Sequence, residues 1–109
     1  ILFVFMNNDL TKNNDLNIVC NSIRKNIILS LFNSGSGHPG SSLSIVEILA
    51  VIGFEFINWN SKSRERIILS KGHAAPALYS LYYELGLIRK EDLMSLRQLD
   101  SNLQGHPDR

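Results

Sequence analysis

The amino-acid sequence predicts an α/β fold of which this chain forms only the N-terminal part. Several segments have helical periodicity, and one short apolar run has the character of a buried strand. A lone strand leaves backbone donors and acceptors unpaired on both edges, and a sheet normally has several strands. We therefore expect the fold to be incomplete, with further strands outside these 109 residues.

The composition is that of a globular chain. Hydrophobic residues make up 44%, charged residues 19%, and the formal net charge is +1, which excludes a disordered tail or a basic nucleic-acid-binding arm. Cys20 is the single cysteine, so an internally disulfide-bonded secreted scaffold is excluded. The longest apolar stretch, residues 43–57, contains two glutamates and is shorter than the ~20 residues of a spanning helix. We expect a cytoplasmic protein with neither nucleic acid nor membrane as a partner.

The first predicted helix runs from Leu16 to about Asn33. A stripe of apolar residues at helical spacing predicts it: Leu16, Val19, Cys20, Ile23, Ile27 and Leu31. Cys20 lies within this stripe, which favours a buried small hydrophobic role over that of a reactive thiol. We expect residues 1–15 to be an N-terminal extension without stable structure, in which Met6 could be the natural start.

A second helix is predicted to begin among the serines at positions 41–44 and to end near Ile57. Ser44 and Glu47 have the spacing of a capping box. Apolar residues surround this helix, so it must be buried on most sides. Trp59 is expected to pack where the helix ends.

After a charged connector at residues 61–66, an apolar run at residues 67–69 predicts the buried strand. Residues 74–85 have helical character, with Gly86 as the expected C-terminal cap. A short helix is predicted over residues 90–96, and residues 98–109 have an irregular pattern.

Each of the three histidines, His38, His73 and His106, follows a glycine and is closely followed by a proline. Glycine permits sharp turns and proline stiffens the chain, so these side chains are expected in defined loops. The segments between them do not align as repeats, and no short ligand spacing indicates zinc. A surface or capping role remains open for any one of them.

Anion binding is a further expectation. His73 follows the predicted strand and precedes a helix, where free N–H groups near Gly72 could bind a phosphate or diphosphate. The glycine-rich and serine-rich residues 34–42 could form a second anion-binding loop. Their spacing matches neither a Walker nor a dinucleotide-binding motif.

Four motifs resemble the transketolase family. They are residues 36–44 (SGHPGSSLS), 68–79 (ILSKGHAAPALY), 96–99 (LRQL) and 103–108 (LQGHPD). The resemblance covers residues 16–109 and corresponds to the start of the thiamine-diphosphate-binding domain, most closely in the N-terminal subunit of two-subunit transketolases. It implies a fold of helices around a mostly parallel sheet.

The resemblance also implies an activity, the transfer of a two-carbon ketol unit from a ketose phosphate to an aldose phosphate with thiamine diphosphate as cofactor. His38 resembles the histidine that contacts the sugar donor and aids proton transfer. His73, with Gly72, resembles the contact to the cofactor diphosphate. His106 resembles a histidine beside both cofactor and substrate, near the reactive carbon.

The family's metal motif and activating glutamate have no counterpart in these residues. The implied Mg²⁺ or Ca²⁺ ligands are therefore expected outside this chain, and the chain alone is expected to be inactive. The expected partners are sugar phosphates and a pyrimidine-binding domain or subunit, in a dimeric assembly. Two alternatives remain. One is an enzyme like 1-deoxyxylulose-5-phosphate synthase, although that family has different residues in the motifs around His38 and His73. The other is a truncated remnant without catalysis.

Overall fold

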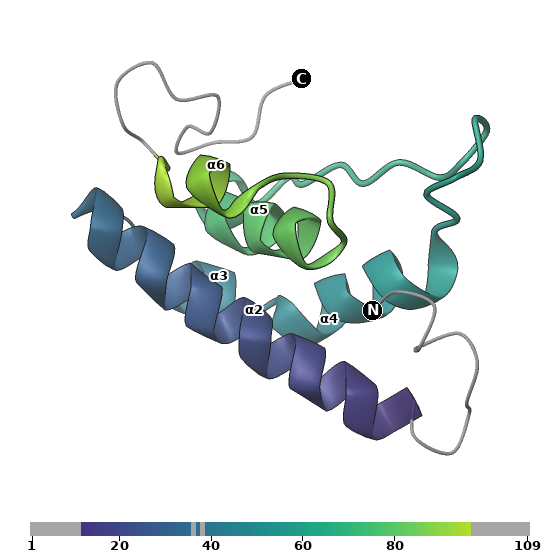
Figure 1. The fold of residues 1–109 in the computed structure, drawn as a ribbon, viewed down its shortest axis with the longest axis horizontal. Helices are drawn as coiled ribbons and strands as arrows, with labels where there is room; N and C mark the ends of the chain where they lie inside the picture. The colour runs from purple at the N-terminus through teal and green to yellow at the C-terminus, as the bar shows by residue number, and fades with distance from the viewer. Residues whose placement is uncertain (1–11, 36, 38, 97–109) are drawn as a thin grey trace.

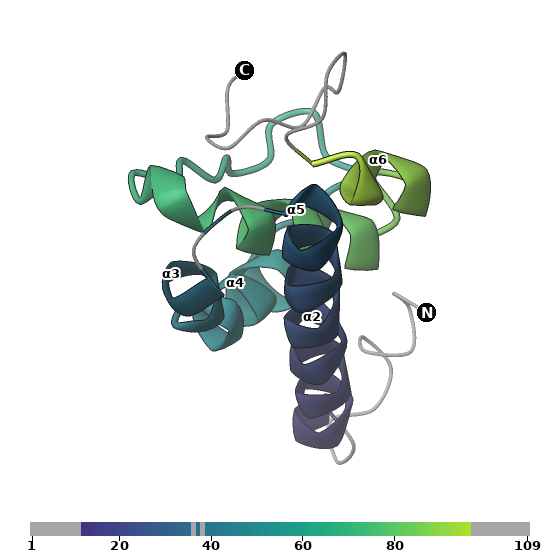
Figure 2. The same ribbon diagram turned by 90° about the vertical axis from the view of Figure 1, so that its left-hand side faces the viewer.

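The computed structural model describes residues 12–35, 37 and 39–96. Their elements follow one another along the chain as α2 (Lys12–Ser34), α3 (Pro39–Leu43), α4 (Val46–Val51), the π-helical turn η1 (Ile52–Phe56), the 3₁₀ turn η2 (Gly72–Ala74), α5 (Ala75–Glu84) and α6 (Lys90–Met94). The long helix α2 contacts α3, α4, α5 and α6 (Figure 1). Figure 2 shows α3 and α4 on one side of α2 and α6 on the other.

The predicted stripe on α2 is confirmed as the centre of the core. Its buried members are Val19, Cys20, Ile23, Ile27 and Leu31, and the packed residues of α4, α5 and α6 complete the same cluster. Burial of a side chain such as Ile23 contributes roughly 1.5–3 kcal/mol. The helix begins at Lys12, before the expected Leu16, while residues 1–11 of the expected extension lie outside the described part.

The opposite face of α2 is also partly apolar. Ile18 and Ile28 are exposed there, and the ring of Phe32 is 84% exposed. The C-terminal half of α2 therefore presents apolar side chains both to the core and to the surface.

The second predicted helix is wrong as a single element. It is divided into α3 and α4, and its last part is the π-helical turn η1. Ile45, not a serine, occupies the N-terminal cap of α4 and provides no capping side chain. The Ser44 hydroxyl instead donates to the Ser41 carbonyl oxygen at 2.9 Å, and Glu47 pairs with Arg24 of α2. The predicted capping box therefore does not form.

Trp59 packs beyond the end of η1, as predicted. Its indole N–H donates to the Gly53 carbonyl oxygen at 2.7 Å. Its ring meets Tyr82 edge-on, with centroids 6.2 Å apart and an interplanar angle of 84°. The Arg64 guanidinium lies 5.0 Å above the same ring, a cation–π contact.

The predicted strand at residues 67–69 is wrong. Within residues 12–35, 37 and 39–96 no strand forms, so the described fold is helical rather than α/β. A strand requires a hydrogen-bonded neighbour, and the helices supply none to this segment. Ile67 and Leu69 pack against the core, whereas Ile68 is 87% exposed.

The third predicted helix is confirmed with small changes. It begins as the 3₁₀ turn η2 and continues as α5, where Pro76 stands in the first turn, a position that does not need its missing N–H. Gly86 has φ +77° and ends the helix as predicted. None of the helices in the described part is both long and apolar enough to cross a bilayer.

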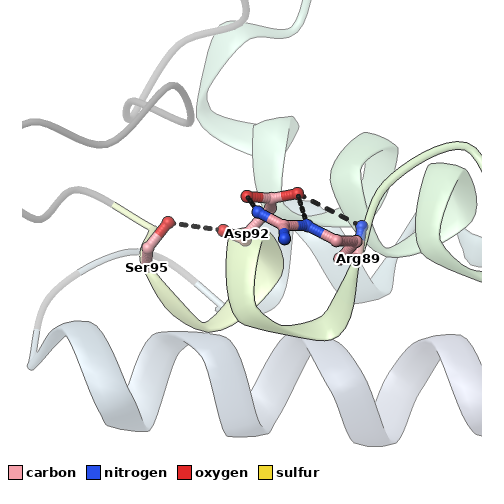
Figure 3. A network of polar contacts seen from close by, with 3 residues as sticks. All are labelled: Arg89, Asp92 and Ser95. Atoms are coloured by element: carbon pink, nitrogen blue, oxygen red, sulfur yellow. Dashed lines mark hydrogen bonds and ion pairs between the residues drawn. The ribbon is translucent and has the colours of Figure 1, made fainter.

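The last predicted helix, α6, ends at Met94 rather than near residue 96. At its start, the Asp92 carboxylate accepts from the Arg89 backbone N–H at 3.3 Å and from the Arg89 guanidinium at 3.4 Å (Figure 3). The Ser95 hydroxyl donates to the Asp92 carbonyl oxygen at 2.6 Å. This network satisfies backbone groups at both ends of the short helix.

Candidate functional site

Two segments that the sequence singled out lie against each other. Helix α3, which belongs to the 36–44 motif, contacts η2, which belongs to the 68–79 motif. α3 also contacts the long helix α2 and the following helix α5. Residues about 30 positions apart thus form one region, which we call the α3–η2 junction (residues 39–44 and 71–74).

The backbone conformation at position 37 requires glycine. Gly37 has φ +123°, a region that side-chain-bearing residues rarely adopt. A Cβ built at this position would lie 2.2 Å from the Leu31 side chain. The local backbone and the end of α2 therefore pack together only when residue 37 lacks a side chain.

A chain of hydrogen bonds joins the two sides of the junction. The Lys71 ammonium donates to the Ser44 hydroxyl, with Nζ and Oγ 2.7 Å apart. Ser44 in turn donates its proton to the Ser41 carbonyl oxygen. The hydroxyl is therefore oriented with its lone pairs toward Lys71.

His73 lies in η2, two residues after Lys71, and its side chain is exposed. The backbone N–H of Ala74 donates to the Lys71 carbonyl oxygen at 2.9 Å, which closes the turn. The ten-residue helix α5 follows directly. The imidazole and the Lys71 ammonium thus come from one short turn at the beginning of a helix.

Two of the three histidines that the sequence singles out lie outside the described residues. His38 falls between the described Gly37 and Pro39, and His106 follows the last described residue, Leu96. Gly72 and His73 are in the described turn η2.

The segment at residues 34–42, predicted to bind an anion, is described only in part. Pro39–Leu43 is helical. The Ser34 hydroxyl donates to the Leu31 carbonyl oxygen within α2. The Ser42 hydroxyl is fully buried and has no hydrogen-bond partner among the described residues. Residues 36 and 38 of this segment lie outside the described part, so anion binding by the segment stays a prediction.

The pairing of Lys71 with Ser44 was not predicted from the sequence. Both residues stand in the quoted motifs, but their 27-residue separation carries no periodic signal. The only available signal was the presence of a cation directly before a glycine–histidine pair.

A separate cavity of about 600 Å³ lies between α2 and the end of α5, and its lining includes Lys25, Glu84 and Lys90. None of the described residues of the α3–η2 junction lines it. Among the described residues, no group of three or more histidine, cysteine, aspartate or glutamate side chains is placed to hold a metal ion.

Comparison with known proteins identifies the family of the chain. Residues 16–109 match the model described as the transketolase, thiamine diphosphate binding domain. The chain belongs to the transketolase family. It is 38% identical over 104 residues to transketolase from Homo sapiens, an alignment that covers 91% of this chain and 17% of the human protein.

Further relatives agree with this assignment. Transketolase-like protein 2 from Mus musculus is 40% identical over 94 residues, covering 82% of this chain and 15% of the relative. Transketolase from Buchnera aphidicola is 38% identical over 96 residues, covering 83% of this chain and 14% of the relative. The chain spans about one sixth of the length of the curated transketolases that it matches.

The donors at the junction suit the diphosphate of the family's cofactor. Lys71 and His73 are both exposed at the turn, where Lys71 carries a positive charge and His73 an imidazole ring. These groups are the donors that bind phosphate oxygens in proteins. In charge and chemistry they fit the phosphate end of thiamine diphosphate.

Proposed function

We propose that this chain contributes part of the cofactor and sugar-phosphate site of a transketolase. The reaction is the transfer of a two-carbon ketol unit from a ketose phosphate to an aldose phosphate. The observation that supports it most is the family match over residues 16–109, which contains the junction of α3 with η2. Since the chain spans about 17% of the human relative, the rest of the site would come from the remaining part of the enzyme.

The three histidines have separate roles in this proposal. His73 and Gly72 bind the diphosphate, His38 binds the sugar donor and moves a proton at its hydroxyl, and His106 donates a hydrogen bond near the reacting carbon. A neutral imidazole has one donor and one acceptor nitrogen near pH 7, which suits proton transfer at sugar hydroxyls. Thiamine diphosphate, when bound, supplies the chemistry of carbon–carbon bond cleavage and formation.

The metal and the partner belong to the same proposal. Oxygen ligands outside this chain would hold Mg²⁺ or Ca²⁺, which would neutralise charge on the diphosphate. A pyrimidine-binding domain or subunit would complete the site, and the assembly would be dimeric. We call this chain together with that remaining part, in one polypeptide or two, the assembled enzyme.

An activity assay tests the proposal. Xylulose 5-phosphate and ribose 5-phosphate are supplied with thiamine diphosphate and Mg²⁺ to the chain alone and to the assembled enzyme. We expect turnover by the assembled enzyme only, because the chain alone lacks the metal ligands and the activating carboxylate. Turnover by the chain alone would contradict its partial role, and an inactive, folded assembled enzyme would contradict the function.

A further inference from the structure

We propose that the cavity between α2 and the end of α5 binds a small organic phosphate that also carries hydroxyl groups, such as a polyol phosphate. The cavity has a volume of about 600 Å³, which is within the range of small-molecule sites in proteins. It lies apart from the α3–η2 junction, since none of the described junction residues lines it. The inference therefore goes beyond the proposed function and does not depend on it.

The first step is the carboxylate in the lining of the cavity. Oε1 of Glu84 accepts from the Asn26 amide at 3.1 Å and from the Ser22 hydroxyl, and all three residues line the cavity. The two donors hold the carboxylate in one orientation. Within the described part of the chain, no hydrogen bond uses Oε2 of Glu84. This second oxygen is available to accept from a hydroxyl group of a ligand.

The second step is the charge. Lys25 of α2 and Lys90 of α6 line the cavity from different helices, and both are exposed. The ion pairs of the described residues involve neither of them, so no described carboxylate neutralises their ammonium groups. Two lysines and one glutamate are the charged residues of the lining, which gives it a net charge of +1. This balance favours an anionic ligand.

The third step is the combination of these groups in one cavity. A phosphate monoester carries about two negative charges near pH 7, and lysine binds phosphate as a point charge. The Glu84 carboxylate, by contrast, binds donors such as hydroxyl groups. A molecule with a phosphate at one end and hydroxyl groups at the other therefore matches both kinds of group. An apolar ligand would take the same charges out of water without giving them partners, which costs free energy.

The simplest competing explanation is that the rest of the assembled enzyme packs over this region and fills the cavity. Such packing would exclude every small ligand. A binding site would instead recognise the phosphate through the two lysines and the hydroxyl groups through Glu84. The two explanations therefore differ in whether a probe binds and in which variants weaken its binding.

Titration calorimetry of the assembled enzyme with sorbitol 6-phosphate tests the inference. This polyol phosphate has no carbonyl group, so it cannot take part in ketol transfer. Sorbitol and inorganic phosphate are titrated in parallel, because each has only one of the two kinds of recognised group. We expect a Kd of about 1 mM or lower for sorbitol 6-phosphate, and binding of sorbitol and of inorganic phosphate that is at least about tenfold weaker.

The lysine variants test the phosphate end of the ligand. Lys25→Met and Lys90→Met should each weaken the binding of sorbitol 6-phosphate about threefold to tenfold, because solvent partly screens the charges of exposed side chains. Lys25→Arg keeps the charge and should keep the affinity. Lys62→Met replaces an exposed lysine of the connector that does not line the cavity, and this matched control should have no effect.

Glu84→Gln tests the hydroxyl end of the ligand. The glutamine oxygen still accepts from Asn26, whereas an amide nitrogen takes the place of Oε2. We expect this variant to bind sorbitol 6-phosphate about threefold to tenfold more weakly than wild type. Its binding of inorganic phosphate should be unchanged or tighter, because a negative charge has been removed from the lining.

The outcomes separate this inference from the proposed function. A folded wild-type assembly that does not bind sorbitol 6-phosphate overturns the inference, whether or not it transfers ketol units. Binding that Lys25→Met and Lys90→Met leave unchanged would place the probe elsewhere and would also overturn it. An assembly that binds the probe at this cavity but transfers no ketol unit would contradict the proposed function alone. Circular dichroism of each variant excludes loss of folding as the cause of weaker binding.

Discussion

The Asn26 side-chain amide donates to the Glu84 carboxylate with Nδ2 and Oε1 3.1 Å apart, which links the core face of α2 to the end of α5. The same carboxylate oxygen accepts from the Ser22 hydroxyl. Asn26 is 6% exposed, so water cannot easily replace this partner. The two helices that carry most of the core are therefore joined by a polar contact as well as by apolar packing.

Replacement of Glu84 by alanine should destabilise the chain. The change leaves the buried Asn26 amide without its acceptor, which costs about 1–3 kcal/mol. Urea denaturation followed by circular dichroism measures the free energy of unfolding. Glu65→Ala, at an exposed position of the connector, is the control and should change it by less than about 0.5 kcal/mol. Equal effects of the two substitutions would exclude a structural role for the Asn26–Glu84 contact.

Two glycines of the same motif should respond to alanine in opposite directions. Gly37→Ala forces a side chain into φ +123° and against Leu31, and should cost about 1–3 kcal/mol. Gly40 lies in α3 with open space around a built Cβ, so Gly40→Ala should stabilise by roughly 0.5–1 kcal/mol through helix propensity. Thermal unfolding of both variants shows whether each substitution raises or lowers the stability of the chain. A destabilising Gly40→Ala or a neutral Gly37→Ala would show that the turn is built differently.

The contact at the start of α6 should make stability depend on pH. Hydrogen bonds from the Arg89 side chain and backbone hold the pKa of the Asp92 carboxyl below its ordinary value of 3.8. A lowered folded-state pKa stabilises the protein above the unfolded pKa, and this stabilisation is lost as the pH falls through the folded pKa. Asp92→Asn should therefore lower the urea midpoint at pH 6 and have a smaller effect at pH 2.5. Glu65→Gln serves as the control, and an equal effect of Asp92→Asn at both pH values would contradict this assignment.

The Cys20 thiol should react slowly in the folded chain. Burial raises its pKa, and the positive charge of Arg24, one turn along α2, opposes this effect only in part. The small fraction of thiolate and the 5% exposure of Cys20 both slow the attack of this thiol on a disulfide reagent. The rate of modification by an aromatic disulfide at pH 8 should rise at least tenfold in concentrated urea. Equal rates with and without urea would show that the thiol is accessible in the native state.

Sequence periodicity predicted the parts of this fold that depend on local pattern. The core face of α2 followed from the spacing of residues such as Ile23 and Ile27, and the end of α5 from Gly86. These features depend on residues within one or two turns of each other. They can therefore be predicted from the sequence alone.

The features that were predicted wrongly depend on partners that are far away in the sequence. The strand at residues 67–69 needs a neighbour that no described segment supplies. The division between α3 and α4 arises because Ser44 binds Ser41 and Lys71 instead of capping α4. Neither of these contacts produces a periodic pattern in the sequence from which it could be predicted.

The candidate site was predicted through its motifs rather than through its geometry. The Gly72–His73 turn before a helix was expected from sequence and is present as η2. The contact of this turn with α3, and the role of Ser44 within it, required the structure. The positions of His38 and His106 relative to His73 remain predictions, because both lie outside the described residues.

Titration of the assembled enzyme with thiamine diphosphate and Mg²⁺ tests the central claim most directly, in wild type, His73→Ala and His38→Ala. His73 is assigned to the cofactor diphosphate and His38 to the sugar donor. We therefore predict that His73→Ala raises the cofactor Kd by about tenfold or more and that His38→Ala changes it much less. Equal cofactor affinities in the two variants would contradict the placement of the diphosphate at the α3–η2 junction.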